Sequence, residues 1–143
     1  MDRYSVTVPP RILAGLRRDA GATAPAECCG ALVGLRHPAE IEIRTLIPVM
    51  NEAHDPNRHY AIDAHTVLRL ERQASCAGLQ LLGFYHSHPA TTAEPSPRDL
   101  ALASPGYIDL IVDARVGVVR AWRLADDRSA FRELPVAVLA GAA

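Results

Sequence analysis

The chain has 143 residues, 49% of them hydrophobic, and its 15 basic residues nearly balance its 16 acidic ones. This length and composition predict a single domain over residues 1–143, with a core large enough to fold without disulfides. The balanced charge argues against a nucleic acid or an anionic membrane as partner, and every basic residue is an arginine, which excludes lysine-based catalysis.

The cysteines and the N-terminus indicate the cellular compartment. Cys28, Cys29 and Cys76 are odd in number and two are adjacent, so we expect reduced thiols rather than disulfides. The first residues lack the apolar core of a signal peptide, and no run approaches the roughly 18 apolar residues of a membrane helix. We therefore expect an unexported, cytoplasmic protein.

Apolar periodicity switches along the chain between that of strands and that of helices, which is typical of a mixed α/β domain. A strand over residues 5–8 leads into a helix that begins at Pro9 and Pro10 and ends at Gly21. Further on, the pattern predicts strands over 31–35 and 40–49 around a turn at His37 and Pro38, and then a polar loop over 51–59.

The second half of the chain alternates in the same way. Asp63 is the expected N-cap of a helix over 64–77 that Gly78 terminates. A strand over 79–88 follows, and Ser96 with Pro97 opens a short helix that runs to about residue 103. We expect three more strands, over 107–112, 116–124 and 131–138, so strands outnumber helices.

Two histidines and an aspartate have the spacing of a metal site. His86 and His88 lie two residues apart at the end of an expected strand, so the pleat directs both imidazoles to one face. Pro89 cannot continue the strand ladder, and the turn that follows returns Asp99 from the first turn of the next helix. This donor set suits one Zn²⁺ per chain, with the fourth tetrahedral position open to water, as in catalytic zinc sites.

A water molecule activated by such a metal needs a base to accept its proton and pass it to the leaving amine. Glu27 is the strongest candidate, because it stands alone in an apolar segment where a carboxylate requires a partner or a task. Glu52 and Glu94, which lie in polar loops, are the alternatives.

These residues resemble the signature of the JAMM (MPN-plus) zinc metallopeptidases: a glutamate, then His-x-His-Pro, six residues, and Ser-x-x-Asp. The resemblance extends from about residue 5 to residue 134. It implies that Glu27 activates the water and that the Ser96 hydroxyl helps to hold the water or the oxyanion. It also implies a cytidine-deaminase-like α/β fold in which a curved mixed sheet lies between helices. The zinc ligands that it implies are His86, His88 and Asp99.

The chain is similar to the compact prokaryotic branch of this family, because it is short and lacks long insertions. Some members of that branch act on small β-grasp sulfur carriers and release cysteine or another residue from a C-terminal Gly-Gly, and segments 85–88 and 90–96 resemble such cysteine-releasing peptidases. The implied partner is a ubiquitin-like or sulfur-carrier protein whose extended tail joins a sheet edge, with loop 51–60 as one wall. A homodimer stays open as an alternative, although no residue pattern argues for it.

Simpler interpretations remain open for several of these residues. Ser96 and Asp99 also match a helix capping box, adjacent Cys28 and Cys29 are typical of core packing, and His54 and His59 are the least secure of the histidines that we assign no role. Two other functions also remain. A catalytically silent MPN scaffold typically lacks ligands, whereas a zinc deaminase needs His-x-Glu and Pro-Cys-x-x-Cys, and neither deaminase pattern occurs here.

Overall fold

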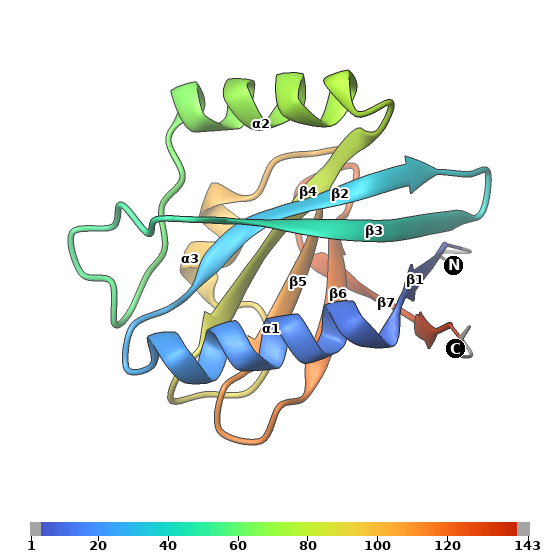
Figure 1. Ribbon diagram of the computed structural model, residues 1–143. Coiled ribbons are helices and arrows are strands. Elements are labelled where there is room, and N and C mark those ends of the chain that lie inside the picture. Colours follow the sequence, from blue (N-terminus) through green and yellow to red (C-terminus); the bar gives the residue numbers. More distant parts are fainter. Residues whose placement is uncertain (1–3, 140–143) are drawn as a thin grey trace.

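The structure is a computed structural model that describes residues 4–139. The strands form one mixed eight-stranded sheet in the order β7-β6-β5-β4-β2-β3-β1-β8. The two edge strands, β7 and β8, are consecutive in the chain, so the sheet is strongly curved (Figure 1). This confirms the expected curved sheet flanked by helices. The strands are β1 (Ser5–Val8), β2 (Cys29–Arg36), β3 (Glu40–Val49), β4 (Gln80–His88), β5 (Ile108–Asp113), β6 (Val119–Leu124), β7 (Phe131–Leu134) and β8 (Val136–Val138).

Two longer helices cover opposite faces of the sheet, and α3 (Pro97–Leu102) follows β4 (Figure 1). Helix α1 (Pro10–Thr23) buries an apolar stripe that includes Leu16 against residues such as Leu32 and Leu110. Helix α2 (Ala64–Cys76) packs Leu70 onto the other face. Its N-cap is Asp63, as expected, since the carboxylate accepts the Thr66 N–H at 2.8 Å. Within residues 4–139, no helix is long and apolar enough to cross a membrane.

Strand β4 lies in the middle of the sheet, antiparallel to β2 and parallel to β5. Its alternation separates two sets of side chains, as the sequence predicted. Tyr85 points into the core under α1 and its hydroxyl donates to Asp19 at 3.1 Å, and the Ser87 hydroxyl accepts the backbone N–H of Cys28 at 2.8 Å. His86 and His88 therefore face the opposite side, toward α2 and the loop that precedes it.

Several predicted boundaries are wrong. Strand β2 spans Cys29–Arg36 instead of residues 31–35, and three further differences have local physical causes. Helix α1 continues through Gly21 to Thr23 and ends only where Pro25 disfavours a helical conformation of the preceding residue. Strand β6 begins at Val119 instead of residue 116, because Gly117 adopts a positive φ of 78° in a turn. The expected strand over 131–138 is two strands, since Pro135 has no N–H to donate and the chain passes there from one edge of the sheet to the other.

Close packing beside β4 makes Gly30 sensitive to substitution. A Cβ added at Gly30 would lie 2.4 Å from the Tyr85 ring and 2.5 Å from the Ile47 carbonyl oxygen. We therefore expect Gly30→Ala to lower the free energy of unfolding by about 1–3 kcal/mol. Urea unfolding followed by circular dichroism measures this change.

Gly21→Ala is the matched control for that substitution. Nothing lies within 4 Å of the added Cβ, and Gly21 is helical. Because alanine favours a helix more than glycine does, we expect this variant to gain about 0.5–1 kcal/mol. A Gly30→Ala protein as stable as Gly21→Ala would contradict the packing described around Tyr85.

Candidate metal centre

His86, His88 and Asp99 each bring one ligand atom to a common point. The two Nε2 atoms are 3.2 Å apart, and Asp99 Oδ2 lies 3.3 Å from that of His86 and 3.2 Å from that of His88. A tetrahedral zinc ion with ligands at about 2.0–2.1 Å requires ligand atoms about 3.3–3.4 Å apart. The nearly equilateral triangle therefore fits one face of a zinc tetrahedron and leaves the fourth corner for another ligand. Within residues 4–139, these three form the group whose ligand atoms converge in this way.

The loop after β4 sets the protonation of His88. Its Nδ1 lies 2.7 Å from the backbone carbonyl of Thr92, which can only accept. In the neutral ring, therefore, Nδ1 carries the proton and the Nε2 lone pair faces the cluster. Burial lowers the pKa of His88, but the hydrogen bonds with Asp99 and Thr92 leave it above its ordinary value. A cation at this point would thus compete with a proton for Nε2.

His86 is oriented in a different way. Its ring is fully buried and stacks on Tyr60, with ring centroids 4.3 Å apart and an angle of 20° between the planes. Its Nδ1 has no hydrogen-bond partner among the described residues. Burial lowers the pKa of His86 despite the nearby Asp99 carboxylate, so the imidazole is held in its neutral, ligating form.

Asp99 is both a helix-capping residue and a member of the cluster. Its Oδ2 accepts the Ser96 N–H at 2.8 Å while the Ser96 hydroxyl accepts the Asp99 N–H at 3.1 Å, which completes the capping box at the start of α3. Burial raises the pKa of Asp99, yet the hydrogen bonds with the two histidines hold it well below its ordinary range. Asp99 is therefore a carboxylate, which is the form that binds a metal.

Glu27 lies beside this cluster, although β2, β3 and α2 separate Glu27 from His86 along the chain. Cys29 pairs with His86 across β2 and β4, and continuing this antiparallel register by two residues places Glu27 opposite His88. Its side chain is only 5% exposed, and burial raises its pKa to about 7 against the opposing effect of His88. Glu27 does not belong to the group of converging ligand atoms.

The loop before α2 is hydrogen-bonded to the backbone of Glu27. Asn51 donates from Nδ2 to the carbonyls of Glu27 and His59, at 3.0 and 2.9 Å, and its Oδ1 accepts the N–H groups of Ala53 and Ala61. The Glu27 N–H donates to Pro56 at 2.8 Å. This loop, expected to border the site, therefore contacts Glu27 through its backbone and His86 through Tyr60.

Other candidate residues lie apart from the converging group. Glu94 is exposed and pairs with Arg120 at 3.2 Å, and Glu52 is exposed in a surface cavity that also contains Asp63. Burial raises the pKa of both Cys28 and Cys29 to about 12, so these thiols stay protonated and pack in the core. Neither of the loop histidines, His54 and His59, belongs to the ligand group.

Sequence reasoning missed several residues around the centre. Nothing in the sequence marked Thr92 or Asn51, whose roles depend on how the loops return, and Tyr60 was seen only as part of a loop. Asp109 is a buried carboxylate in the apolar strand β5. It carried the same signal as Glu27, a lone acidic residue in an apolar segment.

Comparisons with known proteins agree with this arrangement. The model of a family described as prokaryotic homologues of the JAB domain matches residues 9–125. The desampylase of Haloferax volcanii is 37% identical over 131 residues, which cover 89% of this chain and 88% of that protein. A Thermus thermophilus protein named "Probable TtuB-protein conjugate cleaving protease" is 36% identical over 93 residues, 65% of this chain and 60% of that protein.

Solved structures extend the similarity to the fold. The solution structure of a protein from Desulfitobacterium hafniense superimposes with a TM-score of 0.83 at 26% identity, covering 93% of this chain and 92% of that one. The solution structure of a protein from Salinibacter ruber gives a TM-score of 0.69 at 30% identity, covering 96% and 93%.

Proposed function

Because the chain belongs to the family of prokaryotic JAB-domain homologues and is a JAMM-type hydrolase, we propose that it cleaves a peptide or isopeptide bond at the C-terminal Gly-Gly of a small ubiquitin-like or sulfur-carrier protein. The observation that carries this proposal is the triangle of ligand atoms beside the buried carboxylate of Glu27. The names of two relatives, a desampylase and a conjugate-cleaving protease, support the class of substrate.

We assign the metal to His86, His88 and Asp99, as one zinc ion per chain. Two neutral imidazole nitrogens and one carboxylate oxygen are the donor types that zinc prefers, and their separations match a tetrahedral edge. When bound, zinc supplies Lewis-acid activation, which lowers the pKa of a water molecule toward neutrality.

Glu27 is the proposed general base. Its carboxylate takes a proton from the attacking water and then gives that proton to the departing amine, so the same side chain serves both halves of the reaction. A pKa raised by burial to about 7 suits both roles near neutral pH. The position opposite His88 holds the carboxylate next to the ligands without making it one of them.

Ser96 is the proposed donor to the oxyanion. Its oxygen accepts the N–H of Asp99, while no hydrogen bond from its own O–H is found among the described residues. The hydroxyl proton is therefore free to point toward a developing negative charge. Capping the helix and assisting catalysis are compatible, because they use different parts of one hydroxyl group.

Mass spectrometry of carrier proteins tests the proposed function. Candidate sulfur carriers that bear extra residues after Gly-Gly, and conjugates of the same carriers, are incubated with the zinc-loaded protein. We expect cleavage after the second glycine, loss of cleavage with a chelator, and recovery when zinc is returned. The absence of any chelator-sensitive cleavage in either set would contradict the proposal.

A further inference from the structure

A cavity of about 320 Å³ opens beside the metal centre. Tyr60 lines it and also stacks on His86, so the two sites share a wall. Arg98, which precedes Asp99, and Phe84, two residues before His86 on β4, line it as well. A group bound in this cavity would therefore contact a residue that also borders a metal ligand.

Asp109 is the buried charged residue of this cavity. It pairs with Phe84 on β4 and with Trp122 on β6, which directs its side chain to the face of the sheet that carries the metal centre. The residue is 8% exposed, and among the described residues no hydrogen bond or ion pair reaches its carboxylate. Burial raises the pKa of this carboxyl group to about 7, and a cationic ligand bound in the cavity would favour its carboxylate form.

The rest of the lining is suited to an alkyl chain. The Tyr107 hydroxyl donates to Glu71 at 2.5 Å. Arg98 also lines the cavity, but it is exposed, so water screens its charge. A cavity with mostly apolar walls and one carboxyl group matches a side chain made of methylene groups and a terminal cation. The apolar and aromatic walls are formed by Tyr60, Ile62, Val67, Phe84, Leu102 and Tyr107.

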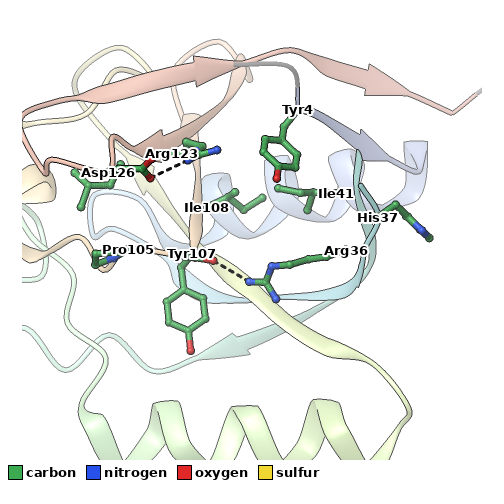
Figure 2. Close-up of a pocket in the computed structure, with 11 residues that line it drawn as sticks. Tyr4, Arg36, His37, Ile41, Pro105, Tyr107, Ile108, Arg123 and Asp126 are labelled. Atoms are coloured by element: carbon green, nitrogen blue, oxygen red, sulfur yellow. Dashed lines mark hydrogen bonds and ion pairs between the residues drawn. The ribbon is translucent and has the colours of Figure 1, made fainter. Parts of the chain in front are cut away.

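A second cavity, of about 290 Å³, provides the contrast (Figure 2). Its charged groups already have partners within the protein: the Arg36 guanidinium donates to the Gly106 carbonyl at 2.9 Å, and Arg123 pairs with Asp126 at 3.2 Å (Figure 2). The cavity beside the metal centre differs because no described residue forms a hydrogen bond or ion pair with its buried carboxyl group.

We propose that the cavity beside the metal centre binds a lysine or arginine side chain on the departing side of the cleaved bond, with Asp109 as the residue that determines this specificity. The inference rests on the proposed function, because a Gly-Gly tail has no side chains to fill a cavity of this size. The departing segment must therefore supply the group that does. The nearest position available to it is the residue directly after the second glycine.

Linear fusions of one carrier test this preference. The residue after Gly-Gly is either lysine or norleucine, which keeps the alkyl chain and lacks the ammonium group, and the following residues are identical. For the wild-type protein we expect kcat/KM to be about tenfold higher for lysine, mainly through KM. In Asp109→Asn the lysine-to-norleucine ratio should fall to about one. The ratio compares two substrates of one protein, so a general loss of activity does not alter it.

The possible outcomes separate the two proposals. Equal cleavage of both fusions by the wild-type protein, or a ratio that persists in Asp109→Asn, would overturn the inference and leave the proposed function intact. If the zinc-loaded protein cleaves neither fusion, and no carrier extension or conjugate either, the proposed function fails. Calorimetry with lysinamide and norleucinamide then tests binding in the cavity independently of cleavage. We expect lysinamide alone to bind, and equal binding or no binding would overturn the inference. The wild-type comparisons stand even if Asp109→Asn does not fold.

Discussion

Glu27→Gln is expected to bind zinc as the wild-type protein does and to hydrolyse substrate about two to four orders of magnitude more slowly, the usual contribution of general acid–base catalysis. Glutamine keeps the size of the side chain but cannot accept the proton. Glu27 is not one of the converging ligands, so the zinc content should not change. Metal analysis and single-turnover kinetics on the same sample measure the two effects separately.

The matched control for this variant is Glu94→Gln. Glu94 is exposed and paired with Arg120, so its loss should leave turnover unchanged. If Glu27→Gln retained activity while Glu94→Gln or Glu52→Gln lost it, the base would have to be reassigned to one of these loop residues.

The pH dependence gives a second check on Glu27. A general base works as the carboxylate, so activity falls as the pH drops through its pKa, which burial raises to about 7. A bound cation favours the carboxylate and shifts this acidic limb below pH 7. We therefore expect kcat/KM to decline on the acidic side of neutrality in the wild-type protein, and Glu27→Gln to lack that part of the profile.

The metal cluster could be predicted because it is local. A strand pleat aims His86 and His88 to one face, Pro89 ends the strand, and the capping pattern at Ser96 places Asp99 in the first turn of a helix. Each step depends on a few neighbouring residues, so short-range rules were sufficient. The structure adds that the capping box and the cluster share one atom, Asp99 Oδ2.

The surroundings of the cluster could not be predicted in that way. The position of Glu27 depends on pairing between β2 and β4, where the contact between Cys28 and Ser87 joins residues 59 apart in the chain. Tyr60 and Asp109 reach the site from a loop and from a neighbouring strand, and their placement depends on the curvature of the whole sheet. The split at Pro135 was missed for a related reason, since the sequence does not show that the chain changes sheet edge there.

His88→Ala is expected to lose stoichiometric zinc, with an affinity at least about two orders of magnitude below that of the wild-type protein, since even residues that only support metal ligands are worth 10–100-fold. The variant removes one of three converging atoms and leaves the Thr92 carbonyl without its donor. Competition with a chromophoric chelator measures the affinity. His37→Ala is the control, because His37 lies on an exposed turn and pairs with Glu42, and it should bind zinc normally.

The stability of His88→Ala then distinguishes two kinds of zinc site. A structural site with four protein ligands contributes folding free energy directly, whereas a site with three ligands and an open position is held by a fold that forms without it. The strands and the capped helix that carry these ligands are packed by the two apolar cores and by the capping box. We therefore expect the zinc-free variant to unfold cooperatively with a near-wild-type circular dichroism spectrum. If His88→Ala bound as much zinc as the wild-type protein, the assignment of His88 as a zinc ligand would be wrong. A zinc-free variant that did not fold would indicate that the ion has a structural role.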